Sequence, residues 1–196
     1  MFTHRLAFAQ LLQSAVTDFN VAAVYAQKPD QANVTHIELR HTPLGEPSAP
    51  NYLGKMKLGD AIKQLLGDNV VRIKKLQREE DYDTADTKIR ELCMTFRNVI
   101  EYGVEQNLLS GIVTRFGRNV STFKLPCLYA ITQDDIALFD GMMTKYSYYD
   151  HSHSLEIPIH LPDIADIEAD LLTMQEWAKQ FNKKCETEQK KARGSK

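Results

Sequence analysis

Apolar residues recur at helical spacing through much of the chain. The stretch 58–77 keeps a 3.6-residue period and predicts an amphipathic helix. A second helix is predicted from a cap at Asp83 or Thr84 to about Arg115. Its apolar stripe comprises Ile89, Leu92, Cys93, Phe96, Val99, Ile100, Val104, Leu108, Leu109 and Ile112. Gly103 interrupts this stripe, weakening helix propensity but permitting close packing. The two helices are expected to pair as a hairpin in a bundle core.

Two more helices are predicted towards the C-terminus. Thr132 and Asp135 have the spacing of a capping box with Asp in place of the usual Glu, so we expect a helix from there to about Lys145. Residues 147–162 are rich in His, Ser and Pro and predict a loop. An apolar stripe within 163–181 then predicts a final helix that faces inward.

The first part of the chain has a different pattern. An amphipathic stretch at 3–18 predicts a helix, and the short runs 21–26 and 34–39 favour β-strands. Residues 41–59 are dense in Pro and Gly, which no regular element tolerates, and they predict a boundary.

The fold class predicted from these patterns is α+β, mainly α. We expect a small α/β part over residues 1–55, a helical bundle domain over 56–185 and a basic, frayed tail over 186–196, where the apolar face is lost.

Composition adds few constraints on partners. With 43% hydrophobic residues, the 196-residue chain can bury a core. The 24 basic and 26 acidic residues give a formal net charge of −2, so contact with nucleic acid would need a local basic patch. No apolar run approaches the roughly 18 residues of a membrane span, and no signal peptide is recognisable. These features predict a cytoplasmic protein that does not contact a membrane.

The three cysteines, Cys93, Cys127 and Cys185, lie far apart and lack the close pairing of zinc or thioredoxin-like sites. They are expected to be reduced, buried or incidental thiols. A glycine-rich phosphate loop is absent, and so is an apolar run ending in paired acids. The sequence therefore predicts no ATP hydrolysis by this chain alone. Common hydrolase and metalloprotease motifs are also absent.

One polar set stands out on the second predicted helix. Arg97 and Glu101 are one turn apart, with Glu105 one turn further. They can form an ordinary surface salt bridge. If His151 folds back onto the bundle, however, an arginine that holds a phosphate and a glutamate and histidine that move protons would suit metal-independent RNA cleavage. Sequence spacing leaves both interpretations open.

Three weaker signals lie near this set. His151 and His153 could bind a metal but lack a defined third ligand, so a solvated loop is favoured and no metal site is predicted. Tyrosines between residues 146 and 149 could stack on bases or pack at a helix end. The most compact basic patch comprises Arg115, Arg118 and Lys124. It could contact phosphates, or its side chains could simply be exposed on a loop.

The stretches 92–125 and 143–151, with Thr3-His4 near the start, resemble the C-terminal region of bacterial ABC-type ATPases of the AAA_13 kind. These are related to ATPase-linked anticodon nucleases of phage defence. By this resemblance, His4 is expected to sense the γ-phosphate. The resemblance implies a catalytic set of Arg97, Glu101 and His151, and phosphate or RNA contacts at Arg115, Arg118 and Lys145.

The same resemblance implies a tRNA-cleaving effector that lacks its own Walker motifs. ATP and Mg would be bound only with a separate nucleotide-binding half, and that half or a defence-system subunit would be the partner. A non-enzymatic helical module that docks on an ATPase or effector subunit is the alternative, as is a truncated gene fragment. The sequence also leaves homo-oligomerisation open.

Overall fold

The computed structural model describes residues 12, 15–22, 32, 38–39, 47–48, 56–115, 120–151 and 160–194. This described part is mainly helical, as expected. The chain forms two compact units: one holds Met1–Tyr52 and Val113–Val120, and the other holds Leu53–Ile112 and Ser121–Lys196.

The first unit contains a short antiparallel pair of strands, β1 (Glu38–Leu39) and β2 (Pro47–Ser48). Residues 15–22 are helical, so the prediction of a strand beginning at residue 21 is wrong for residues 21 and 22. The Asn20 side chain, within this helical stretch, bonds both backbone groups of Ala32, at 2.8 and 2.9 Å. These bonds supply the Ala32 amide and carbonyl with partners that a strand would otherwise provide.

The second unit begins with the predicted helical hairpin. Its first arm is one continuous run of α2 (Leu58–Gln64), the π-helical turn η2 (Leu65–Val70) and α3 (Val71–Arg78). Its second arm consists of α4 (Tyr82–Gly103) and the π-helical turn η3 (Val104–Leu108). Both π turns add residues per turn relative to an α-helix, so side chains after them are rotated around the helix axis.

The ends of the second arm differ from the sequence prediction. The cap is Asp81, whose carboxylate accepts a hydrogen bond from the Thr84 backbone amide at 3.2 Å. Asp83 and Thr84 therefore lie inside the first turn. The helical run ends at Leu108, well before Arg115, because Ser110 and Gly111 take left-handed conformations with φ of 54° and 60°. A left-handed residue stops an α-helix and frees the chain to change direction.

Three further helices complete the unit. They are the 3₁₀ helix η4 (Thr122–Ala130), α5 (Gln133–His151) and α6 (Ile164–Gly194). The prediction that α5 stops near Lys145 is wrong, because Tyr149 packs against the core and favours another turn. α6 remains helical to Gly194, through most of the segment predicted as a basic, frayed tail. There α6 continues along η4, and the Gln189 amide contacts the Cys127 sulfur.

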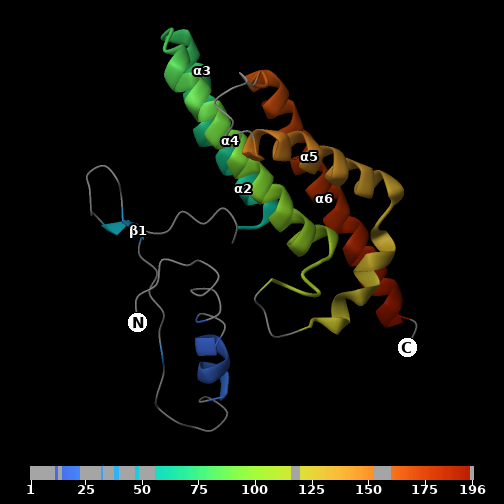
Figure 1. Cartoon of the computed structure of the whole chain (residues 1–196). Helices are drawn as coiled ribbons and strands as arrows, with labels where there is room; N and C mark the ends of the chain where they lie inside the picture. The colour runs from blue at the N-terminus through green and yellow to red at the C-terminus, as the bar shows by residue number, and fades with distance from the viewer. Residues whose placement is uncertain are drawn as a thin grey trace. The chain divides into compact units, whose positions relative to one another are not determined.

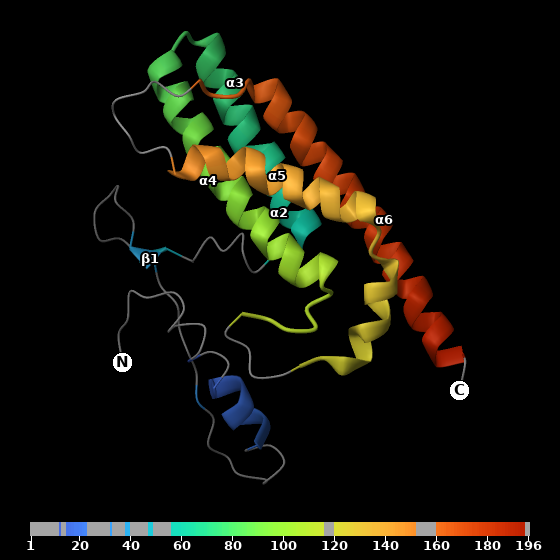
Figure 2. The same cartoon turned by 45° about the vertical axis from the view of Figure 1, so that its right-hand side comes forward.

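The core of this unit lies where α2, α4, α5 and α6 meet. α4 packs against α2 on one side and α5 on the other, and α6 packs against α2 and η4 (Figures 1 and 2). The largest fully buried side chains are Tyr146, Phe96, Phe181, Leu58, Ile62, Leu65, Ile73, Leu92, Ile100, Ile167, Leu171 and Met174. None of the helices in the described ranges combines the length and apolar content of a membrane-spanning segment.

Gly103 permits the close packing predicted from its position. A Cβ atom at this residue would lie 3.1 Å from one Leu58 methyl carbon, 3.2 Å from the other and 3.4 Å from the Phe139 ring. Leu58 is fully buried, so other core side chains surround the methyl groups that would have to move. The absence of a side chain at Gly103 therefore sets how closely α2, α4 and α5 approach.

We expect Gly103→Val to lower the free energy of unfolding by about 1–3 kcal/mol, because the added methyl groups overpack the contact with Leu58. Urea unfolding followed by circular dichroism measures the change. Gly141→Val is the matched control, since a Cβ at Gly141 on α5 meets no atom within 4 Å. Equal stability of the two variants would contradict this account of the packing.

Candidate functional site

Arg97 and Glu101 lie at the seam between α4 and α5. The Arg97 guanidinium is 3.0 Å from the Glu101 carboxylate, and its Nε donates to the Ser147 hydroxyl on α5 at 3.2 Å. Only 19% of the Arg97 side chain and 29% of the Glu101 side chain are exposed. Partial burial strengthens such a pair, so it is more than a loose surface ion pair. The salt bridge expected from the sequence is confirmed.

The end of α5 carries the third residue of the predicted catalytic set. His151 is the last residue of α5, so its prediction as part of a loop is wrong. It follows Ser147 by four positions, and residues four apart share one face of a helix. The helix backbone therefore brings His151 one turn beyond the point where Arg97 contacts α5. At His151 the structure describes the backbone.

Lys145 and Tyr146, just before Ser147, share one carboxylate of α6. The Lys145 ammonium is 2.6 Å from Asp170 Oδ2, and the buried Tyr146 hydroxyl donates to the same oxygen at 2.8 Å. Burial, followed by the bond to Asp170, raises the pKa of Tyr146 well above its usual value. Tyr146 therefore stays protonated and acts as a donor. Lys145, predicted as a phosphate contact, is paired to Asp170 and remains 38% exposed.

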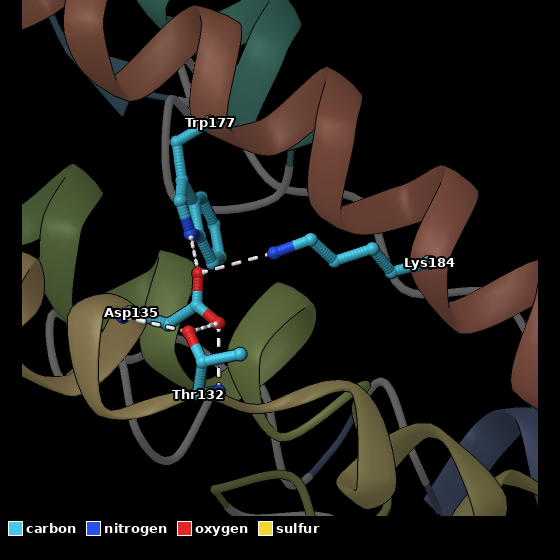
Figure 3. Close-up of polar contacts among 4 residues, drawn as sticks. All are labelled: Thr132, Asp135, Trp177 and Lys184. Atoms are coloured by element: carbon cyan, nitrogen blue, oxygen red, sulfur yellow. Dashed lines mark hydrogen bonds and ion pairs between the residues drawn. The ribbon is translucent and has the colours of Figure 1, made fainter.

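A second carboxylate, which is buried, fixes the opposite end of α5 (Figure 3). Asp135 Oδ2 accepts from the Thr132 backbone amide at 2.8 Å and its hydroxyl at 2.7 Å, while Thr132 Oγ1 accepts from the Asp135 amide at 3.3 Å. This confirms the predicted capping box. Asp135 Oδ1 accepts from the Trp177 indole on α6 at 2.7 Å and lies 4.0 Å from the Lys184 ammonium.

The charge of Asp135 is stabilised although the residue is buried. Burial by itself would raise the pKa of this carboxyl, but the bonds from Thr132 and Trp177 and the charge of Lys184 together lower it. A carboxylate that is fully hydrogen-bonded in this way is a structural anchor between α5 and α6. No exposed atom of it is aimed at a ligand, since the side chain is only 5% exposed.

The remaining predicted residues are His4, Arg115, Arg118 and Lys124. His4 and Arg118 lie outside the described residues. Arg115 belongs to the segment Val113–Val120 of the first unit, whereas Arg97 belongs to the second. Lys124 lies in η4, with its ammonium 5.9 Å from the Phe123 ring centroid.

The tyrosine cluster is divided between burial and exposure. Tyr146 is a core residue in edge contact with Phe96, whereas Tyr148 is 59% exposed and contacts Tyr149 edge-on at 5.4 Å. His153 lies outside the described residues. Within the described part of the chain, no group of three or more His, Cys, Asp or Glu residues is placed to hold a metal ion.

Sequence reasoning missed Ser147, Asp170 and Trp177 as partners of this region. Ser147 carried one usable signal, because it precedes His151 by one helical turn. Asp170 and Trp177 carried none, since their partners on α5 lie 24 and 42 positions away in the sequence. Such contacts depend on the way two helices cross.

Comparisons with known proteins do not assign this site. The chain matched no family model, and searches of curated proteins and of solved structures found no match either.

The Asp135 anchor predicts a pH-dependent stability. Because folding lowers the pKa of this carboxyl, its stabilising effect is present above the unfolded value of about 3.9 and is lost as pH falls through the lower folded value. We expect Asp135→Asn to lower the unfolding free energy at neutral pH by about 1–3 kcal/mol, because the amide cannot accept from all three donors. The difference from wild type should shrink below about pH 4.

Thermal unfolding of both proteins across this pH range measures the effect. Asp134→Asn is the matched control, since Asp134 is exposed in the same first turn. An Asp135→Asn variant as stable as wild type at neutral pH would contradict the anchoring role.

Proposed function

We propose that this chain is the C-terminal portion of an ABC-type ATPase of the anticodon-nuclease-like family and that its helical unit cleaves RNA, with tRNA as the substrate. The observation that carries this proposal is the bond from Arg97 to Ser147. That bond holds a guanidinium and a carboxylate from α4 one helical turn from His151 on α5. A cation, a carboxylate and an imidazole are the groups that metal-independent phosphodiester cleavage uses.

The proposed reaction uses the RNA as its own nucleophile. Glu101 or His151 accepts the proton of a 2′-hydroxyl, whose oxygen attacks the adjacent phosphorus. The bond from phosphorus to the 5′-oxygen breaks, and the other group returns a proton to that oxygen. Arg97 stabilises the additional negative charge on the phosphoryl oxygens. The products are a 2′,3′-cyclic phosphate and a 5′-hydroxyl. The proposed step uses only proton transfer and the RNA's own hydroxyl, without a metal ion or a reductant.

In the same proposal, the first unit is an α/β remnant of the nucleotide-binding domain. A separate ATPase half in the cytoplasm would supply ATP and Mg, and His4 would sense the γ-phosphate. Binding of RNA would require Arg97 to exchange at least one of its contacts with Glu101 and Ser147 for a phosphate. Their partial exposure makes such an exchange possible without unfolding of the core.

We expect the purified full chain to cleave total tRNA in the presence of a metal chelator and to leave 2′,3′-cyclic phosphate ends. Arg97→Ala, Glu101→Gln and His151→Ala should each reduce the rate by a factor on the order of 10²–10⁴. Denaturing gels measure cleavage, and end-labelling before and after phosphatase treatment identifies the ends.

Lys88→Ala is the control for this experiment, because it removes a comparable ion pair, Lys88–Glu91, from the same helix. The proposal fails if folded wild type and variants leave tRNA equally intact with the ATPase half both present and absent. Cleavage that the chelator abolishes would contradict the metal-independent mechanism.

A second candidate function is a non-enzymatic module that docks on the ATPase half or an effector subunit. The specific observation is the apolar exposure on η4, where Phe123 is 63% exposed and Tyr129 is 86% exposed. Large apolar side chains gathered at one place are typical of interaction sites.

In a pull-down with the products of adjacent genes, we expect the double variant Phe123→Ser/Tyr129→Ser to reduce capture at least tenfold if docking is the function. Arg97→Ala should capture as well as wild type, because it leaves η4 unchanged. The docking function is contradicted if the η4 variant, shown to be folded, retains its partner.

A further inference from the structure

Two of the three cysteines come together at the end of the helical unit. Cys127 lies in η4 and Cys185 lies in α6, and these two elements pack along each other. Cys127 contributes to the raised pKa of the Cys185 thiol, as expected of two thiols that lie near each other. Two neighbouring contacts fix the pair: the Gln189 amide, one turn after Cys185, donates to Cys127 Sγ at 3.0 Å, and Ser110 Oγ lies 3.8 Å from Cys185 Sγ.

The surroundings distinguish this pair from the third cysteine. Cys127 is buried and Cys185 is half-buried, so a small reagent can reach the pair through Cys185. Cys93 is fully buried on α4, where burial raises the pKa of its thiol to about 12. Cys93 therefore lacks both a neighbouring thiol among the described contacts and access from solvent.

We propose that Cys127 and Cys185 form an intramolecular disulfide that joins η4 to α6 when the protein meets a small-molecule disulfide. The Cys185 thiolate, having released its proton to solvent, attacks one sulfur of the reagent and expels a thiolate that takes up a proton. Cys127 then attacks Cys185 Sγ and expels the second thiol. Two protein thiols are oxidised and one reagent disulfide is reduced to two thiols.

The rate and the consequence follow from the position of the pair. Burial, opposed in part by the bond from Ser110, raises the pKa of Cys185 to about 11, so little thiolate exists at neutral pH and the exchange is slow. The bond would close a loop of about 60 residues, which restricts the unfolded chain and stabilises the fold. It would lock η4, which carries the exposed Phe123 and Tyr129, onto α6.

The test is incubation of the reduced full chain with glutathione disulfide at mildly alkaline pH, followed by intact-mass and peptide analysis without reductant. We expect the mass to fall by about 2 Da and one cross-linked pair of peptides to contain Cys127 and Cys185. The midpoint of thermal unfolding should rise on the order of 5–10 °C and return after reduction.

Two variants complete this test. Cys93→Ala should still lose two thiols, whereas Cys185→Ser should lose none. A stable glutathione adduct without the cross-link, a bond that involves Cys93, or intact thiols after prolonged treatment at alkaline pH would each overturn the proposal. These outcomes do not depend on whether the chain cleaves RNA.

Discussion

The position of α5 depends on two carboxylates that bind it to α6. Asp135 at the start of α5 accepts from Trp177, and Tyr146 near the end of α5 donates to Asp170. The later residue of α5 pairs with the earlier residue of α6, so the two helices run in opposite directions. Removing one partner would leave a buried polar group unpaired, which costs more than an ordinary hydrogen bond contributes. These bonds therefore select one arrangement among the many that apolar packing alone would permit.

This arrangement places polar side chains together where α4 and α5 pack against each other. With α5 anchored at both ends, Ser147 meets Arg97, and the last turn of α5 lies beside the Arg97–Glu101 pair. The ring of Phe96 packs against Tyr146 near this seam, and the ring of Phe139 packs against Trp177 towards the other end of α5. A rigid support can hold reacting groups or can equally form a stable docking face. The half-buried ion pair favours the first use, and the exposed side chains of η4 favour the second.

Much of the helical unit was predictable because its signals are local. The apolar stripe of α4, the hairpin that it forms with the preceding helical arm, and the Thr132–Asp135 capping box each depend on residues within a few turns. Predictions at the helix ends were less accurate. The sequence around Ser147 is rich in polar and loop-forming residues, yet α5 continues because Tyr149 packs on the core. The charged residues after 186 likewise remain helical beside η4.

The sequence by itself therefore determined the helical character, the buried stripes and the Arg97–Glu101 pair, since periodicity and i,i+4 spacing fix them without reference to the rest of the chain. Only the tertiary structure decided that Ser147 is the contact of Arg97 and that Asp170 receives both Lys145 and Tyr146. It also decided that η4, with Cys127, packs along α6, with Cys185. These partners are distant in the sequence. Their meeting depends on how closely and in which direction the helices cross, which the packing at Gly103 and the bonds of Asp135 and Asp170 control.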